Sequence, residues 1–244
     1  MDEFGRKVIE TMCAHASVRQ YTSEPVGDED RKAVEEAVRA ASSSCFLQLV
    51  TVVRITDPEK RRTLAELSGA QAHVANAPEF WVFCSDLHRD KLLYPTADTG
   101  WTEQMLVGAL DVGIAAQSAM TALESLGLGG VFVGGLRNGI QAVDDLLELP
   151  DQVVPLLGLA FGHPARKNGV KPRLPKTLTF QTDAYHPVDR QVLKQYDDMM
   201  REYYRTRPEH PKDVTWSETL VPILQRERRP FVREFLQKKG WAQK

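Results

Sequence analysis

One stretch, residues 101–137, constrains the fold of this chain more than any other. Within it, residues 102–126 contain no proline and are rich in Ala, Leu, Met and Gln, which favour helix. Apolar residues recur so densely that no wide polar face remains, a pattern typical of a buried helix. We expect the helix to stop at Gly127, because glycine readily adopts the left-handed conformation of a C-cap. The run 131–133 then predicts a buried strand that ends at a pair of glycines.

The rest of the chain alternates between helical and extended patterns. Apolar spacing predicts helices over 2–14, 28–41, 59–67, 140–147, 188–205, 216–226 and 230–239, and strands over 49–55, 79–85 and 153–161. Buried strands between helices indicate an α/β or α+β fold. Beyond Gly162 the sequence pattern changes, and the rigid basic connector KPRLP follows at 171–175. We therefore expect a core over 1–165 and a C-terminal extension over 166–244, joined as one continuous structural unit.

Composition and charge limit the class of protein. The chain has 244 residues, 42% hydrophobic and 26% charged, which suits an ordinary globular protein of one large or two small domains. A net charge of −2 argues against a nucleic-acid binder. The charge is uneven, however: residues 201–244 carry eleven Lys and Arg against six Asp and Glu. An anionic small molecule is one candidate partner for this basic tail.

Cellular location is predicted from the cysteines and the apolar segments. The three cysteines are an odd, scattered set without a CxxC motif, which favours a reducing cytoplasm. The N-terminal residues lack the pattern of a signal peptide. The densest apolar stretch, 105–116, is interrupted by Asp111 and is shorter than a membrane span requires, so we expect a soluble protein.

Familiar catalytic motifs are missing from the sequence. There is no Walker loop, no GxSxG and no HExxH, and the glycines at 127–135 have the wrong spacing for a Rossmann fingerprint. The six histidines lie far apart, so nothing supports a metal site. Nucleophilic and metal-ion catalysis are therefore disfavoured.

Two groups of polar residues are candidate anion ligands. His15, Ser17 and Arg19 lie together after the first helix, and Lys171 and Arg173 flank a proline that holds them extended. If the groups meet in space, they can clamp a phosphate through charge-assisted hydrogen bonds. The alternative is that His15 sits at a helix C-terminus, where the macrodipole favours it. Lys171 and Arg173 would then be solvated loop charges.

Other candidate residues have two interpretations as well. The serine run at 42–44 is either a helix terminator or a cradle for a polar ring edge. Gly134 and Gly135 allow either close approach of a flat ligand or tight packing of helix on strand. Four aromatic residues are interpreted as core: Phe46, Trp81, Phe83 and Phe132.

Taken together, the motifs resemble one family. HASVRQYTSEPV, SSSCFLQ, GAQAHV, EFWVFCSD, GLGGVFVGGLRN and KPRLP occur in the order found in oxygen-insensitive NADPH nitroreductases of the NfsA type and in the related Frp-type flavin reductases. The likeness continues into EYYRTR and RERRPFV near the end of the chain. It implies an α+β nitroreductase-like fold, a central sheet flanked by helices around a long buried helix. It also implies an intertwined homodimer with this helix at the subunit interface and two flavin sites.

The resemblance also implies roles for single residues. His15, Ser17, Arg19, Lys171 and Arg173 would hold the phosphate and ribityl chain of bound FMN. Ser43, with Ser44 and Phe46 from the other subunit, and Gln71 would meet the edge of the flavin ring. Phe132, Val133, Gly134 and Gly135 would line the ring, with a backbone N–H near its N5. Arg207, Lys212 and Arg229 would bind NADPH. No side chain is implied as catalytic, because the flavin carries the chemistry.

Two residues depart from the family pattern. Ala16 stands where the family usually has Arg, which removes one group that would anchor FMN, and Cys45 stands where it commonly has Ser. The resemblance implies a cytoplasmic NADPH oxidoreductase that reduces nitroaromatics, quinones and related acceptors by a two-electron ping-pong reaction. The alternatives are an NADPH-dependent flavin reductase that supplies free reduced FMN, and a non-catalytic flavin-binding protein.

Overall fold

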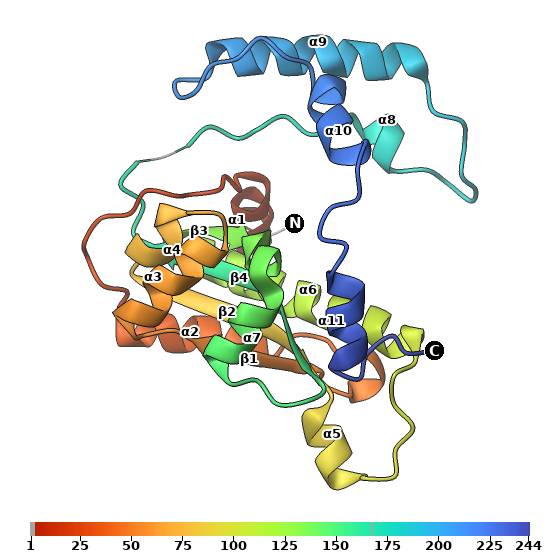
Figure 1. Cartoon of the computed structure of the whole chain (residues 1–244). Coiled ribbons are helices and arrows are strands. Elements are labelled where there is room, and N and C mark those ends of the chain that lie inside the picture. Colours follow the sequence, from red (N-terminus) through yellow and green to blue (C-terminus); the bar gives the residue numbers. More distant parts are fainter. Residues whose placement is uncertain (1–2, 167) are drawn as a thin grey trace. The chain divides into compact units, whose positions relative to one another are not determined.

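The computed structural model describes residues 3–166 and 168–244. The chain forms two compact units, shown in Figure 1. The first comprises Met1–Asn168 together with Arg229–Lys244, and the second comprises Gly169–Arg228. The chain thus leaves the first unit once and returns to it.

A four-stranded sheet forms the centre of the described part of the first unit. Its order is β1 (Val50–Arg54), β2 (Glu79–Asp86), β4 (Val153–Gly162) and β3 (Gly129–Val133), and every neighbouring pair is antiparallel. The three strands predicted from apolar runs and the strand predicted after the long helix are all confirmed. Antiparallel pairing decides the fold class in favour of α+β.

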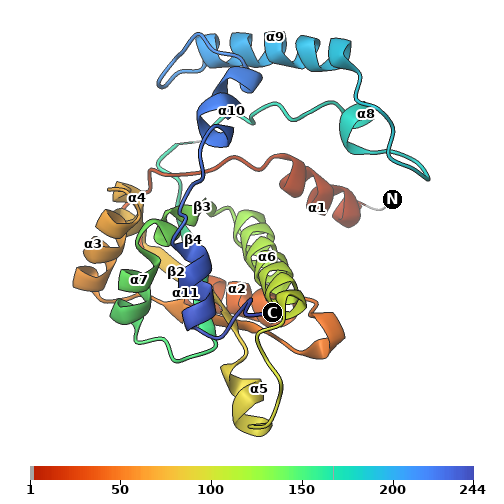
Figure 2. The ribbon, with the colours of Figure 1, turned by 45° about the vertical axis from the view of Figure 1, so that its right-hand side comes forward.

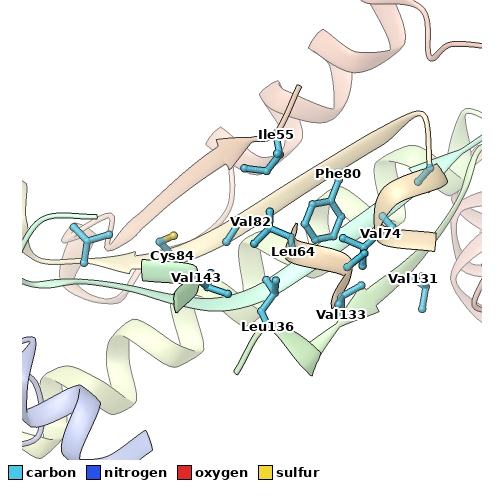
Figure 3. Close-up of a cluster of buried hydrophobic side chains, with 14 residues drawn as sticks. Ile55, Leu64, Val74, Phe80, Val82, Cys84, Val131, Val133, Leu136 and Val143 are labelled. Atoms are coloured by element: carbon cyan, nitrogen blue, oxygen red, sulfur yellow. The ribbon is translucent and has the colours of Figure 1, made fainter. Parts of the chain in front are cut away.

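Successive side chains of a strand point to opposite faces of the sheet, so each strand contributes residues to two separate cores. On β2, Phe80, Val82 and Cys84 face one layer, while Trp81 and Phe83 face the other. Helices α3 (Pro58–Leu67), α4 (Ala72–Asn76) and α7 (Ile140–Leu147) cover the first face, whose core is drawn in Figure 3. Helices α2 (Asp28–Arg39) and α6 (Thr102–Ser125) cover the second face, as Figure 2 shows.

Helix α6 is the long helix predicted from the sequence. It ends as expected: Gly127 adopts a φ of 80°, and the N–H of Leu128 donates to the carbonyl of Leu123 at 3.0 Å. The prediction that the helix is buried all round is wrong for a single chain. Val112, Ala115, Ala119 and others pack on the sheet, but the opposite face is exposed at Leu106, Leu110 and Ile114.

The stretch 105–116, expected to be too short for a membrane span, lies within the longer helix α6. By length and composition alone, α6 could cross a membrane. Its packing is that of a core helix, however, because one face lies against Trp81, Phe83 and Phe161 of the sheet. The same face buries Asp111, whose carboxylate is hydrogen-bonded within the chain.

Shorter elements complete the first unit. Helix α1 (Glu3–Cys13) confirms the predicted N-terminal helix, although the expected cap Asp2 lies outside the described residues. Helices α4 and α5 (His88–Leu93) were not predicted from the sequence. Two 3-10 helices are η1 (Ser44–Phe46) and η2 (Gly134–Gly139).

The final segment packs onto the first unit after helix α11 (Val232–Lys238). The Lys239 ammonium lies 2.9 Å from Asp144 Oδ1 on α7, with both side chains buried. Trp241 is fully buried in a cluster with Leu49 and Leu87. These contacts fix the returning segment, and Arg229 at its start, to the first unit.

The second unit is helical, with α8 (Lys176–Thr179), α9 (Arg190–Thr206) and α10 (Trp216–Leu224). Asp189 caps α9 by accepting the N–H of Gln191 at 2.8 Å. Tyr196, Met200 and Tyr204 form its buried cluster, against which Trp216 packs. The helices predicted over 188–205, 216–226 and 230–239 are confirmed, the last as α11.

Candidate functional site

The glycine pair after β3 packs directly on the residue before α4. Gly69 has a φ of 91° and turns the chain out of α3, so that Gln71 stands at the N-terminus of α4. Gln71 Nε2 donates to the carbonyl of Ser68 at 2.6 Å. A Cβ at Gly135 would overlap both the Gln71 amide and the Ser68 carbonyl. The structure thus packs Gln71 directly against Gly135, with no room for a side chain between them.

The strand before this glycine pair contributes its backbone rather than its side chains. Val133 is buried in the core between the sheet and α3, and Phe132 packs toward α6 with Leu159 opposite it. Both side chains are therefore engaged in the interior. The interpretation of Phe132 as a core residue is confirmed in part, since it is half-buried.

Arg229 reaches this same glycine turn from the returning segment. Its Nε donates to Asn138 Oδ1 at 2.8 Å. Arg137 lies beside Gly134, and its guanidinium donates to the carbonyl of Leu156. Burial and the neighbouring charge of Arg229 lower the pKa of Arg137. The site residues Gly134, Gly135, Gln71 and Arg229 therefore share one region of the first unit.

The segment after α1 runs beside the edge strand β3. The Val18 N–H donates to the carbonyl of Gly130 at 2.9 Å, and the Tyr21 hydroxyl donates to the carbonyl of Ala160 at 2.9 Å. Burial, only partly opposed by the charge of Arg19, raises the pKa of Tyr21. His15 lies beyond the end of α1, and its Nδ1 is 2.6 Å from Glu124 Oε1 near the end of α6.

Burial and the charge of Arg19 affect the pKa of His73, two residues after Gln71. Desolvation by burial, followed by the positive charge of Arg19, lowers the pKa of His73 on α4. The Nε2 atom of His73 is buried and has no hydrogen-bond partner within the described residues. Ser17 accepts a hydrogen bond from Asn168 Nδ2 at its carbonyl, at 2.7 Å.

The serine run is held by a buried carboxylate that the functional interpretation of the sequence missed. Ser43 donates its hydroxyl proton to Asp111 Oδ2 at 2.7 Å, and the Ser44 N–H donates to Oδ1 at 3.1 Å. We call residues 43–49 the serine loop. Phe46 at its tip is 79% exposed, so the interpretation of Phe46 as core is wrong, whereas Trp81 and Phe83 are buried as expected.

In the second unit, cations from two predicted groups surround one tyrosine ring. Lys171 Nζ, Arg207 Cζ and Lys212 Nζ lie 5.0, 5.1 and 4.4 Å from the centre of the Tyr204 ring. Arg173 donates to the carbonyl of Lys171 at 2.8 Å. The three cations are attracted to the ring face, which gathers positive charge at one place.

Ion pairing separates the basic residues of the tail into two classes. Arg201 and Arg205 both pair with Asp213, at 3.2 and 2.8 Å. In the part of the chain that the structure describes, no ion pair with a carboxylate is seen for Arg207, Lys212 or Arg229. These three therefore have charge to offer an anion, as do Arg226, Arg228, Arg233 and Lys238, for which the structure also shows no ion pair within the described residues.

The arrangement contains no metal centre in residues 3–166 and 168–244, where no three His, Cys, Asp or Glu side chains gather as ligands. The three cysteines are free, with Cys84 buried. Burial raises the pKa of the Cys84 thiol to about 12, which makes it a poor nucleophile.

Three residues of the site region were not predicted from the sequence, because their local sequence gave little indication of a role. Asp111 is a single acid in an otherwise apolar helix, and an isolated charge there requires partners. Asn138 ends the motif GLGGVFVGGLRN, but nothing local links it to Arg229, ninety-one positions later. Ser68 contributes through its carbonyl, so its residue type carries no signal.

Comparisons with known proteins cover nearly the whole chain. Residues 14–163 match the nitroreductase family, and residues 171–244 match the C-terminal domain of the same family. An oxygen-insensitive NADPH nitroreductase from Salmonella typhimurium is 47% identical over 96% of this chain and 98% of the relative. An NADPH-flavin oxidoreductase from Vibrio harveyi is 43% identical over 97% and 98%. A solved Vibrio harveyi NADPH:FMN oxidoreductase complexed with NAD+ superimposes with a TM-score of 0.92, at 42% identity over 98% and 100% of the two chains.

Proposed function

The chain belongs to the nitroreductase family, and we propose that it is an FMN-dependent NADPH oxidoreductase. Its substrates are nitroaromatics, quinones and related small acceptors. The single observation that carries the proposal is the glycine turn at Gly134 and Gly135, beside which Gln71 and Arg229 lie. The similarity of nearly the whole chain to an NADPH nitroreductase and to an NADPH-flavin oxidoreductase supports the proposal.

The residues around the turn fit a flavin. A flat ring needs backbone that it can approach closely, and the half-buried Gly134 would offer it. Gly135 is buried, and a Cβ there would collide with Gln71 and Ser68, so this glycine serves tight packing. Phe132 and Val133 offer backbone groups because their side chains are packed inward. FMN, when bound, supplies the two-electron chemistry, so no side chain has to act as nucleophile. Gln71 and Ser43, with Ser44 and Phe46 of the other subunit, would meet the edge of the ring.

The phosphate and ribityl chain of FMN need cations and hydrogen-bond donors. We assign this role to His15, Ser17, Arg19, Lys171 and Arg173, as the family resemblance implies. In this assignment residues 1–165 form the flavin-binding core, and residues 166–244 complete the phosphate site and contribute to NADPH binding.

NADPH recognition is assigned to Arg207, Lys212 and Arg229. A 2′-phosphate carries two negative charges at neutral pH, and arginine binds such groups through paired hydrogen bonds. Cations already neutralised by Asp213 have less to offer, which favours Arg207 over Arg205. NADPH donates two electrons and leaves before the acceptor enters the same pocket, and this order is ping-pong.

We also propose that the enzyme acts as a homodimer in the cytoplasm. The exposed face of α6 and helix α1 line a groove of about 1000 Å³, with Leu110, Ile114, Val8 and Met12 among its residues. Exposed apolar patches of this kind mark contact surfaces. A second copy of the chain would bury them, which would restore the all-round burial expected of α6.

The visible absorption spectrum tests the proposal. Purified protein, with FMN added where needed, should show a flavin band that bleaches under anaerobic NADPH and much more slowly under NADH. A band that NADPH leaves unchanged would indicate a non-catalytic flavin-binding protein. A protein that binds no FMN would contradict the proposal as a whole.

A second function is favoured by one observation, the 43% identity to an NADPH-flavin oxidoreductase. Such an enzyme would release reduced FMN to a partner instead of reducing a nitro compound. The ratio of kcat/KM for free FMN to that for a nitroaromatic acceptor separates the two. A larger value for free FMN would favour the flavin reductase.

A further inference from the structure

The serine loop is tied to α6 through both oxygens of one carboxylate. Asp111 is 1% exposed. Besides its bonds to Ser43 and Ser44, it accepts the N–H of Leu49 at Oδ2, at 3.3 Å. The Ser43 hydroxyl in turn accepts the N–H of Gln48 at 2.6 Å. Asp111 therefore holds the first and the last residues of the loop at one point.

The backbone between those ends is in a conformation that requires such support. Cys45, Phe46 and Gln48 have φ values of 50°, 57° and 55°. Side chains other than glycine rarely adopt this left-handed region, and it persists where surrounding contacts over-determine it. Released from Asp111, the loop is expected to relax to other conformations.

A carboxylate suits this position for a chemical reason. Two N–H groups and one O–H converge on it, and an ionised carboxylate is an acceptor at both oxygens with no donor of its own. An asparagine of the same size would turn an NH2 group toward at least one of these donors. The three bonds cannot all survive that exchange.

The loop presents two groups that are free to meet a ligand. The Ser44 hydroxyl has no hydrogen-bond partner within the described residues, and Phe46 is exposed. The Ser43 hydroxyl proton, by contrast, is committed to Asp111. Ser43 thus acts as a link between the carboxylate and the loop.

We propose that Asp111 is a positioning residue for flavin binding, which fixes the serine loop so that Ser44 and Phe46 stand in the geometry that the flavin requires. The proposal rests on the function proposed above, because that function places the loop at the flavin. It adds that the affinity for FMN depends on a buried group that does not itself touch the cofactor.

Helix α6 links this positioning to the proposed dimer contact. Asp111 points into the chain, while its neighbours Leu110 and Ile114 lie on the exposed apolar face. One helical turn therefore carries both the loop anchor and the surface assigned to the second copy. The serine loop is then fixed relative to that surface, which is what a loop serving the partner's flavin needs.

The test compares Asp111→Asn and Ser43→Ala with Asp144→Asn as a matched control. Asp144 is also a buried carboxylate, but its partner is Lys239 on the returning segment. Each full-length protein is stripped of flavin and titrated with FMN, and binding is followed by quenching of flavin fluorescence. Hydrogen exchange at the amides of residues 44–49 reports on the loop, and visible circular dichroism at saturating FMN reports on the ring environment.

We expect Asp111→Asn to raise the Kd for FMN by at least about tenfold and Ser43→Ala by a smaller factor in the same direction. Both variants should speed exchange at the Ser44, Gln48 and Leu49 amides and alter the dichroism of the bound flavin. Asp144→Asn should lower the Tm with a Kd within about twofold of the wild type.

Three outcomes would overturn the proposal. The first is unchanged FMN affinity in Asp111→Asn, or in Ser43→Ala if Asp111→Asn does not fold. The second is an equal loss of affinity in Asp144→Asn, which would show that general destabilisation is the cause. The third is unchanged exchange in the loop, which would show that Asp111 does not hold it. A wild-type protein that binds no FMN contradicts the proposed function itself, and that result is distinct from all three.

Discussion

Gly135 lies so close to Gln71 that no side chain fits between them. A Cβ at Gly135 would overlap both the Gln71 amide and the Ser68 carbonyl that this amide contacts. We therefore predict that Gly135→Ala displaces Gln71, destabilises the fold by about 1–3 kcal/mol and weakens FMN binding. Gly169→Ala is the control, since a Cβ there meets nothing within 4 Å. Urea unfolding and FMN titration measure both effects, and a fully stable Gly135→Ala protein would refute the steric argument.

Arg207 should discriminate between the two nicotinamide cofactors. Arg207→Ala is expected to raise the KM for NADPH roughly tenfold or more, because a hydrogen bond to a charged group contributes about 1.5–3 kcal/mol. The KM for NADH should change little, since NADH lacks the 2′-phosphate. Arg205→Ala is the matched control, because Arg205 already pairs with Asp213. Steady-state kinetics with both donors decide the matter, and equal effects on NADPH and NADH would remove Arg207 from phosphate recognition.

The apolar face of α6 should hold two chains together. Leu110 is 64% exposed in the single chain, and Leu110→Lys would place a charge inside the proposed contact. We expect this variant to shift the protein from dimer to monomer in size-exclusion chromatography with light scattering, and to lose FMN. Leu93→Lys on α5 serves as the control, because Leu93 is 88% exposed outside the groove. A Leu110→Lys protein that remains dimeric would place the interface elsewhere.

His73 should make stability depend on pH. Desolvation by burial and then the charge of Arg19 lower its pKa in the folded state, so the unfolded chain binds a proton more readily. The stability that a neutral His73 provides is present above about pH 6.5, the ordinary histidine pKa, and is lost as pH falls through the lower folded pKa. Between about pH 7.5 and pH 5, the wild type should lose more free energy of unfolding than His73→Gln. Denaturant unfolding at both pH values measures the difference, with the exposed His186→Gln as control.

Introducing a cation at position 16 should tighten FMN binding. Ala16 stands between His15 and Ser17, at the position where the family resemblance implies Arg. Ala16→Arg is predicted to lower the Kd for FMN by roughly tenfold, through one added charge-assisted hydrogen bond to the phosphate. Gln20→Arg adds the same charge at an exposed neighbouring position and should have much less effect. Equal tightening by the two variants would point to a general electrostatic attraction instead of a contact.

Local pattern is sufficient to predict the long elements of the fold. α6 and its glycine cap, α2, α7, α9 and the four strands all follow from apolar spacing and from glycines that end segments. Helices α4 and α5 have five and six residues, so their sequences hold little more than one helical period each. The exposure of one α6 face could not be predicted. Composition shows that the residues on this face are apolar, but it does not show whether the same chain covers them.

The candidate site shows a different limit. Glycine, lysine and arginine positions are predictable because their residue types suggest close approach or anion binding. Asp111 and Asn138 act through partners distant in the sequence, at Ser43 and Arg229, and such pairings appear only once the chain is folded. Residue type predicts a core position for Phe46, because most aromatic residues are buried, but the left-handed backbone of its loop turns it outward.

The second unit is an insertion within the first, because the chain enters it at Gly169 and leaves it at Arg228. A segment anchored at both ends can change length at small entropic cost to its host, since loop-closure entropy grows only with the logarithm of length. Natural variation can therefore remodel these helices, and the cations they carry, without refolding the sheet. Preference for the electron donor can then diverge among relatives while the glycine turn stays the same.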